Sequence, residues 1–320
     1  RRRDPPGHSM NERIVVVVGP TAAGKTRLAC ELSEKLLAEV VSADSQQCYR
    51  GLDAATAKPT AEEQARAPHH LLDFADPEEQ LDAAAFVKLA DAAIADISRR
   101  GRRVIVAGGT GLWIRALLRG LLAAPGRSEE FRAALRRDEA EVGLAGLHER
   151  LARVDPEAAQ AIRPTDRVRI ERALEVHALT GSRLSELQRR HGFAEERYAP
   201  LVLHVSPPRE VLWDRIAVRT RELFRSGALE RETRSLLARI EQVPAAARAL
   251  KIIGYGEMAA ALRGSFPVAE AEDRVSARTR RYAKRQGTWF RRDAGPPLAW
   301  PIDVTGLSDR ALRWYEGRPG

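Results

Sequence analysis

Eight consecutive residues near the start of the chain could bind a phosphate group: Gly19, Pro20, Thr21, Ala22, Ala23, Gly24, Lys25 and Thr26. They fit the pattern G-x-x-x-x-G-K-[ST], in which the glycines let the backbone curl so that its N–H groups point inward. These donors and the positive end of the following helix hold a phosphate or diphosphate. Lys25 adds a point charge, and the Thr26 hydroxyl can ligate Mg²⁺. The pattern predicts phosphate binding and leaves the reaction open; a chance glycine-rich turn is the alternative.

The segments around this phosphate loop, residues 19–26, support the prediction. The apolar run 14–18 predicts a buried strand before the loop, and Leu28, Leu32 and Leu36 give a helical pattern after it. Strand, loop and helix in this order form the context that the pattern requires.

Asp44 is the second candidate, because it ends the next predicted strand, residues 39–43. In an open α/β sheet, ligands bind at the carboxyl ends of the strands. One carboxylate beside a phosphate loop could bind Mg²⁺ through water or act as a general base. Asp is also a favoured helix N-cap, and position alone does not decide between these roles.

A glycine-rich turn follows the third predicted strand, residues 103–107, and contains Thr110. Its glycines permit close approach of the backbone, and Thr110 can donate a hydrogen bond to a ligand; a tight strand-to-helix turn is the alternative. Many ATPases place an acid at the end of this strand, where this chain has Ala107 and Gly108. That difference counts against NTP hydrolysis.

The overall pattern predicts an α/β fold, with a P-loop NTPase-like parallel sheet flanked by helices. A fourth strand is predicted at 201–205, and near-continuous apolar strands suit a sheet covered on both faces. Helical patterns at 86–97 and 211–223 lie between the strands. The expected core comprises residues 11–127 and 199–320, interrupted by an all-helical insertion at 128–198, with a further basic helical region at 268–292.

The composition favours a polyanionic partner. The formal net charge is +9 and the pI is about 10.0, which suggests nucleic acid, although a solvated arginine-rich surface is the alternative. Two cysteines, Cys30 and Cys48, provide neither a disulfide framework nor a metal cluster. No apolar stretch reaches the ~18 residues of a membrane span, and residues 1–10, expected to be a disordered basic extension, lack the apolar part of a signal peptide. A cytoplasmic location is expected.

Near the C-terminus, residues 279–292 interleave basic side chains with Tyr282, Trp289 and Phe290. Basic groups on phosphates, with bases stacked on aromatic rings, are how proteins hold unpaired RNA. An amphipathic helix with its aromatic side chains in the core is the alternative. We expect both, with the aromatics partly packed and the basic face binding.

The ordered set of motifs resembles the tRNA dimethylallyltransferases, also called tRNA isopentenyltransferases, over nearly the whole chain after Arg13. Besides the phosphate loop, the motifs are D-S-Q-Q-C-Y-R-G at 44–51, T-A-K-P at 56–59, H-H-L-L-D at 69–73, G-G-T-G-L at 108–112, R-I-E-R-A-L-E-V at 169–176, I-G-Y at 253–255 and Y-A-K-R-Q-G-T-W-F-R at 282–291. The last of these is highly specific.

The resemblance implies transfer of a dimethylallyl group from dimethylallyl diphosphate to N6 of the adenosine 3′ to the anticodon, with Mg²⁺ as cofactor. It places Asp44, Thr26, Lys25, Thr110 and Arg219 in catalysis, with Asp44 as general base and Thr26 as metal ligand. The diphosphate would lie in the phosphate loop, clamped by Arg219 and by Arg215 on the same helix face. Gln47 could recognise the adenine through paired hydrogen bonds.

The resemblance also implies that the helical insertion grips the anticodon stem-loop of tRNA. Its implied tRNA contacts are Asp44, Ser45, Gln46, Gln47, Thr110, Arg132, Val168, Arg169, Ile170, Glu171, Arg172, Lys251, Tyr255, Lys284, Arg285, Gln286, Thr288, Trp289 and Arg291. The family usually has Gln at Val168 and a cation at Gly256, so the contacts made there differ in this chain. A monomer is the default expectation.

Three other functions suit part of the sequence. A P-loop kinase for a small molecule would use the same loop and fold, but it explains neither the helical insertion nor the basic C-terminal run. An adenylate prenyltransferase acting on free nucleotides would share the loop and Asp44 without needing that run. A non-catalytic RNA-binding module leaves Lys25, Thr26 and Asp44 unexplained.

Overall fold

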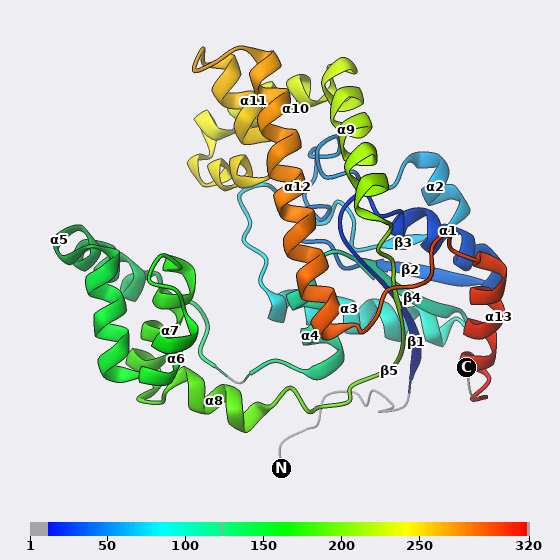
Figure 1. The fold of residues 1–320 in the computed structure, drawn as a ribbon, viewed down its shortest axis with the longest axis horizontal. Coiled ribbons are helices and arrows are strands. Elements are labelled where there is room, and N and C mark those ends of the chain that lie inside the picture. The colour runs from blue at the N-terminus through cyan, green and yellow to red at the C-terminus, as the bar shows by residue number, and fades with distance from the viewer. Residues whose placement is uncertain (1–11, 123, 319–320) are drawn as a thin grey trace. The chain divides into compact units, whose positions relative to one another are not determined.

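The computed structural model describes residues 12–122 and 124–318. It contains a five-stranded parallel sheet flanked by helices (Figure 1). The strands are β1 (Arg13–Val18), β2 (Ala38–Ser42), β3 (His69–His70), β4 (Arg103–Gly108) and β5 (Ala199–His204), in the order β3-β2-β4-β1-β5. All four predicted strands are present, which confirms the predicted fold class. The pattern missed β3, because two residues are too few to show an alternation. The extension expected at residues 1–10 lies outside the described residues.

Helices cover both faces of the sheet. They are α1 (Lys25–Leu36) and α13 (Val304–Tyr315) on one face, with α3 (Ala83–Arg99) and α4 (Gly111–Arg119) on the other. Successive residues of a strand point to opposite faces, so Val15 and Val17 pack toward α1 while Val16 packs toward α3. Because both faces are covered, the strands are apolar throughout rather than alternating.

A further group of helices follows β5 and has a small core of its own. It comprises α9 (Arg209–Arg225), α10 (Ala228–Gln242), the 3-10 helix η1 (Pro244–Lys251), α11 (Tyr255–Leu262) and α12 (Val268–Asp293). Leu229, Leu236 and Met258 are among the residues that pack in this core. The long helix α12 continues down to the sheet, where Phe290 is buried, so the basic helical region expected at 268–292 is confirmed (Figure 1).

The chain divides into two compact units, of which the second runs from Arg119 to Glu195 and interrupts the first. It contains α5 (Glu129–Val154), α6 (Pro156–Ala161), α7 (Arg167–Thr180) and α8 (Leu184–His191), packed around a separate apolar cluster. Tyr198, which the sequence placed in the insertion, packs in the core of the first unit, and its hydroxyl donates to Asp91 at 2.8 Å. Among the described residues, no helix combines the length and the apolar character that crossing a membrane demands.

Candidate active site

The phosphate loop connects β1 to α1, and its shape depends on two glycines. Gly19 has a φ of 151°, and a Cβ there would lie 2.1 Å from the Val205 carbonyl oxygen. Gly24, with a φ of 99°, immediately precedes α1. Side chains are disfavoured at both positions, so the sequence makes the backbone curl between a buried strand and a helix N-terminus.

Lys25 provides the positive charge within the loop. Its Nζ donates to the Pro20 carbonyl at 3.0 Å, and within the described residues no carboxylate lies at ion-pair distance from it. Burial by the loop and the nearby charge of Arg219 lower the pKa of Lys25 to about 8, while Asp44 opposes the shift. The ammonium is therefore held in place while its charge is left uncompensated by an ion pair.

Two arginines of α9 brace the same loop, as the spacing of four predicted. The Arg215 Nη1 donates to the Ala23 carbonyl at 3.0 Å. Arg219 donates to the Thr21 hydroxyl at 3.4 Å and to the Ala55 carbonyl at 3.2 Å. Burial lowers the pKa of Arg219, again opposed by Asp44. In the described part of the chain neither guanidinium is in an ion pair, so both charges remain available to an anion.

Asp44 follows β2, and the turn that contains Thr110 lies between it and the phosphate loop because β4 separates β1 from β2 in the sheet. The Ser45 N–H donates to the Thr110 hydroxyl oxygen at 2.9 Å, and that hydroxyl donates to the Ser45 Oγ at 3.2 Å. The Asp44 Oδ1 accepts from the Gln46 N–H at 2.9 Å, so Asp44 caps a turn rather than a helix. The segment with Thr110 is a tight strand-to-helix turn and also a part of the site.

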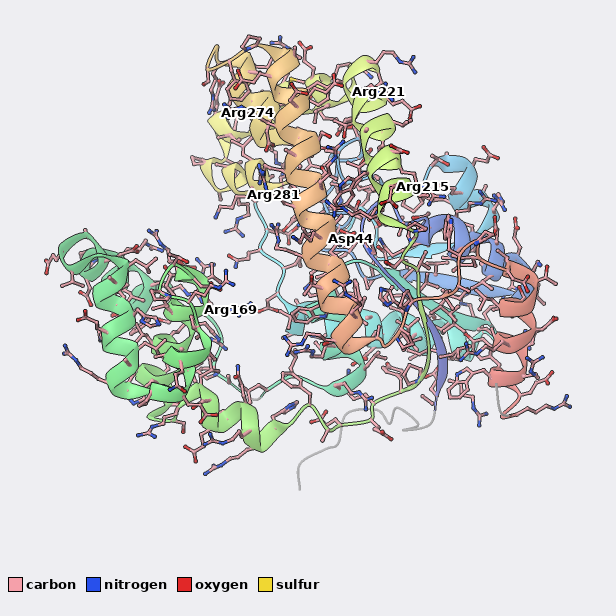
Figure 2. The ribbon with its side chains drawn as sticks, in the orientation of Figure 1. Asp44, Arg169, Arg215, Arg221, Arg274 and Arg281 are labelled. Carbon is pink, nitrogen blue, oxygen red and sulfur yellow. The ribbon has the colours of Figure 1, made fainter. Side chains whose placement is uncertain are left out.

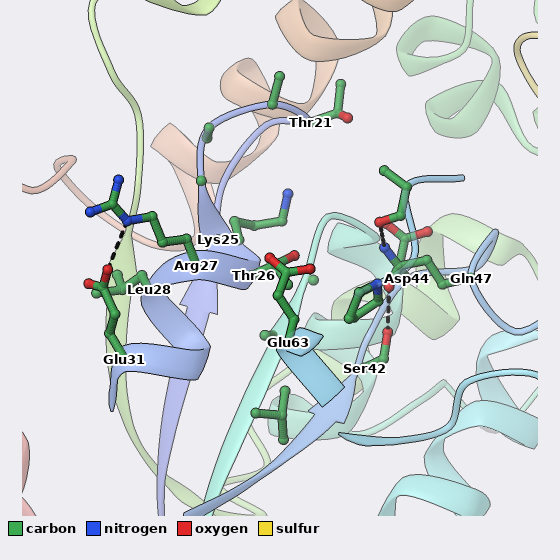
Figure 3. A pocket seen from close by; sticks show the side chains of 18 of the residues that line it. Thr21, Lys25, Thr26, Arg27, Leu28, Glu31, Ser42, Asp44, Gln47 and Glu63 are labelled. Carbon is green, nitrogen blue, oxygen red and sulfur yellow. Dashed lines mark hydrogen bonds and ion pairs between the residues drawn. The ribbon is translucent and has the colours of Figure 1, made fainter. Parts of the chain in front are cut away.

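A cavity of about 630 Å³ opens beside the loop, and Lys25, Thr26 and Asp44 all face it (Figure 3). A second cavity of about 240 Å³ extends toward α12 and is lined by residues that include Tyr282 and Arg285. Asp44 lines both cavities. In Figure 2 Asp44 lies near α9, which carries Arg215 and Arg221, and near α12, which carries Arg274 and Arg281.

The structure brings most of the predicted catalytic and diphosphate-binding residues to these cavities, and a few of the implied tRNA contacts. Thr21, Ala22, Ala23, Gly24, Lys25, Thr26, Asp44, Gln47, Arg215 and Arg219 line the first, while Gln46, Lys251 and Arg285 line the second. Gly19 and Pro20 are buried within the loop, and Ser45 and Thr110 lie between the loop and Asp44.

The side-chain amide of Gln47 forms hydrogen bonds to other groups of the protein. Its Oε1 accepts from the Ser42 hydroxyl at 3.1 Å, and its Nε2 donates to the Ala57 carbonyl at 2.8 Å. Recognition of an adenine by this amide would therefore require these two hydrogen bonds to be exchanged.

Tyr255, one of the implied tRNA contacts, is fully buried. Its hydroxyl hydrogen-bonds Glu232, which also accepts from the Asp53 N–H at 3.0 Å. Glu232 lies on α10, and Asp53 lies in the segment after Asp44. The Tyr255 side chain therefore helps to hold that segment against α10 and does not face solvent.

The implied contacts on α12 fall into two classes. Lys284, Arg285, Thr288 and Arg291 are exposed. Trp289 is half-buried with the Arg115 guanidinium 4.4 Å from its ring centroid, and Gln286 is buried. Only the side chains of the first class lie on the surface. This agrees with the expectation of a helix with a packed side and an exposed basic face.

In the helical unit, Glu175 is buried and organises two of the implied contacts. Arg132 and Arg172 each donate to it at 2.9 Å, and so does the Ser128 N–H. Burial disfavours the ionised carboxylate, but these hydrogen bonds outweigh it and lower the pKa of Glu175 to about 2. The two arginines are thus committed to a structural ion-pair cluster.

The remaining implied contacts of this unit differ in exposure. Ile170 is fully buried in the apolar core, and Glu171 is half-buried. Val168 is 71% exposed, and the Arg169 side chain is exposed with its Nε 3.2 Å from an Asp166 oxygen. Arg169 and Val168 are therefore the two that present their side chains most openly.

Sequence reasoning missed one wall of the main cavity. Trp300, Pro301 and Ile302 line it, and the Trp300 ring centroid lies 5.0 Å from the Arg215 guanidinium carbon. These residues lie far along the chain in a loop without a motif, so no local signal could have identified them.

The oxygen groups present fit Mg²⁺ rather than a metal held by protein alone. Within the described residues no group of three His, Cys, Asp or Glu side chains could hold a metal ion. The Thr26 hydroxyl and the Asp44 carboxylate face the same cavity. One or two protein oxygens completed by substrate phosphates and water is the usual arrangement for Mg²⁺.

The chain is similar to known proteins over nearly its whole length. A family model described as IPP transferase matches residues 47–293. A protein of Anaeromyxobacter sp. (strain K) named tRNA dimethylallyltransferase is 53% identical, covering 96% of this chain and 98% of its own length. A protein of the same name from Geobacter metallireducens is 50% identical, covering 95% and 97%.

Solved structures of similar fold include a full-length tRNA isopentenylpyrophosphate transferase from Bacillus halodurans. It is 35% identical with a TM-score of 0.69, covering 96% of this chain and 97% of its own. A eukaryotic dimethylallyltransferase acting on tRNA is 26% identical with a TM-score of 0.80, covering 96% and 80%. With the family model matching most of its length and relatives at half identity, the chain belongs to the IPP transferase family.

Proposed function

We propose that this protein transfers the dimethylallyl group from dimethylallyl diphosphate to N6 of the adenosine 3′ to the anticodon of tRNA, releasing diphosphate. The observation that carries the proposal is the position of Asp44 in the wall shared by two cavities, one beside the phosphate loop and one toward the basic helix α12. A transferase needs such an arrangement, because its donor and acceptor must meet at one catalytic group.

The phosphate-loop side is suited to a diphosphate leaving group. Lys25, Arg219 and the N–H groups at the start of α1 would stabilise the negative charge that develops as the bond between C1 and the diphosphate oxygen breaks. Mg²⁺, held by Thr26 and the diphosphate, would neutralise part of that charge. Neither Lys25 nor Arg219 is in an ion pair within the described residues, so no carboxylate neutralises their charges.

The acceptor side requires a base. The lone pair of an exocyclic adenine amine is delocalised into the ring, so N6 is a poor nucleophile. Asp44 would take one proton from N6 as the bond from N6 to C1 forms, and general-base assistance of this kind contributes ~10²–10⁴-fold. Tyr282 lines the cavity on this side, and burial, with the nearby charge of Asp44, raises the pKa of its phenol, which therefore stays protonated.

The RNA would be held by basic surfaces. The target base must leave the anticodon-loop stack to reach the half-buried carboxylate of Asp44 in the cavity wall. The exposed residues of α12, including Lys284, Arg285 and Arg291, and Arg169 of the helical unit are our candidate phosphate contacts. Binding that depends on such contacts weakens steeply with salt.

The test is transfer of radiolabel from dimethylallyl diphosphate, with Mg²⁺, to unmodified tRNA that has adenosine next to the anticodon. Free AMP and ATP are run in parallel. Label in tRNA alone is the expected result, and the labelled nucleoside should be N6-dimethylallyladenosine at the position 3′ to the anticodon.

Label in free nucleotide alone would make the protein an adenylate prenyltransferase. Label in neither, with γ-phosphate transfer from ATP to a small molecule in a parallel assay, would support the kinase. Either result would overturn the proposal.

A further inference from the structure

Gln286 is a buried amide on a helix whose neighbouring residues are basic and exposed. Only 6% of its surface is accessible. Its Oε1 accepts from the Thr21 N–H at 2.8 Å, and its Nε2 donates to the Gly109 carbonyl at 2.9 Å. The side chain thus uses both ends of its amide on backbone groups from two different loops.

These two loops are the ones that build the site. Thr21 lies in the phosphate loop, where Arg219 also contacts its hydroxyl. Gly109 precedes Thr110, which hydrogen-bonds Ser45 beside Asp44. Gln286 therefore links the diphosphate side of the site to the Asp44 side through one amide group.

Helix α12 packs closely on the turn that contains Gly109 and Gly111. A Cβ at Gly109 would lie 2.3 Å from the Gln286 Nε2, and a Cβ at Gly111 would lie 2.2 Å from the Trp289 Nε1. Because glycines stand at both positions, α12 packs directly on the turn and the Gln286 amide can reach both loops. Without the Gln286 amide, the N–H of the half-buried Thr21 would lose the acceptor that it uses here.

We propose that Gln286 is a positioning residue that sets the conformation of the phosphate loop, rather than a side chain that contacts tRNA. The inference rests on the proposed function in one respect, that the loop binds a diphosphate. The burial of Gln286 and its two hydrogen bonds to backbone groups separate it from exposed neighbours such as Lys284 and Arg285, which remain candidates for RNA contact.

The experiment measures two affinities on the full chain by calorimetry: inorganic pyrophosphate with Mg²⁺, and an anticodon stem-loop RNA. Gln286→Ala should weaken pyrophosphate binding by about tenfold or more, because the Thr21 N–H loses its acceptor. RNA affinity should stay within about twofold, since no phosphate contact is removed. Gln242→Ala, at an exposed helical glutamine, is the matched control and should change neither.

A double-mutant cycle separates positioning from general loss of structure. Gly109→Ala should weaken pyrophosphate binding, because a Cβ 2.3 Å from the Gln286 Nε2 forces the amide to move and so to lose its hydrogen bonds to the two loops. In the double variant the clashing amide is gone, so the two losses should fall well short of adding. Gly109→Ala alone still tests the inference if Gln286→Ala fails to fold.

Three results would overturn the inference. They are unchanged pyrophosphate binding in Gln286→Ala, a loss confined to RNA binding, and fully additive losses in the double variant. If the unaltered protein itself does not bind pyrophosphate, the proposed function fails instead, so the two failures are distinguishable.

Discussion

Arginines occupy two regions of this molecule in different ways. Around the phosphate loop, Arg215 and Arg219 donate to carbonyl and hydroxyl oxygens, which hold the guanidinium without neutralising it. In the helical unit, Arg132 and Arg172 donate to the buried carboxylate of Glu175. Neutral acceptors leave a positive charge for a ligand, whereas a buried carboxylate uses that charge for structure. The partner of an arginine, rather than its burial, therefore distinguishes a binding role from a structural one.

The largest effect is expected on turnover, from a change at Asp44 in the region of the phosphate loop. Asp44→Asn keeps the shape of the side chain but removes the proposed base, so turnover should fall by ~10²–10⁴-fold. Tight binding of tRNA should persist. Single-turnover transfer and RNA affinity are the measurements, and near-normal transfer rates would refute the general-base role.

The variant Glu175→Gln tests the structural role of Arg132 and Arg172 in the helical unit. Removing one partner of a buried ion pair leaves buried guanidinium charge uncompensated, which typically costs about 3–5 kcal/mol. We expect loss of hydrogen-exchange protection throughout α5 and α7, with little change in the first unit. Glu186→Gln, which breaks an exposed pair with Arg190, is the control and should change unfolding by only about 0.5 kcal/mol. Equal effects of the two variants would contradict the distinction.

Arg219→Gln should have the opposite effect to Glu175→Gln: activity should fall while thermal stability is kept. Loss of one charge-stabilising donor typically lowers kcat by ~10²–10³-fold. Thermal stability should change little or rise, because a desolvated charge without an ion-pair partner is removed. Arg225→Gln, at an exposed position of the same helix, is the control. A stability loss as large as that of Glu175→Gln would remove the difference between the two regions.

The pH dependence of pyrophosphate binding sharpens the comparison at Lys25. Because burial lowers its pKa to about 8, its charge should be lost as the pH rises through that value in the free protein, well before an exposed lysine would deprotonate. Pyrophosphate affinity should therefore fall above pH 8 relative to a Lys25→Arg variant, in which the guanidinium stays charged. The affinities of both proteins are measured by calorimetry from pH 6.5 to about 9.5. A constant ratio between them would contradict the assignment.

The smallest effect is expected at Arg169, which is exposed and whose one ion-pair partner among the described residues is Asp166. Arg169→Gln should weaken RNA binding a few-fold and reduce the slope of log affinity against log salt by about 0.7–0.9. Titration of stem-loop RNA at several salt concentrations measures this slope. An unchanged slope would exclude a phosphate contact by this side chain.

The phosphate loop and Asp44 could be found from the sequence because the information is local. A buried strand, a glycine-rich turn and a helix follow one another within residues 14–36, and each dictates its own backbone. Asp44 could be assigned to the site because it ends a strand of a parallel sheet, and carboxyl ends share one edge. The packing of the α12 aromatics and the exposure of its basic residues were also anticipated, from the mixed composition of the run, whereas the burial of Gln286 was not.

The tertiary structure alone decided which arginines keep their charge for a ligand and where Gln286 points. Arg132 and Arg219 are both arginines on charged helices, and only the fold places Glu175 against one and the Thr21 hydroxyl against the other. The order of strands, which places the Thr110 turn between the loop and Asp44, is likewise set by packing. Sequence determines local backbone through nearby residues, whereas these partners lie from 43 to 265 residues apart and meet only when the cores assemble.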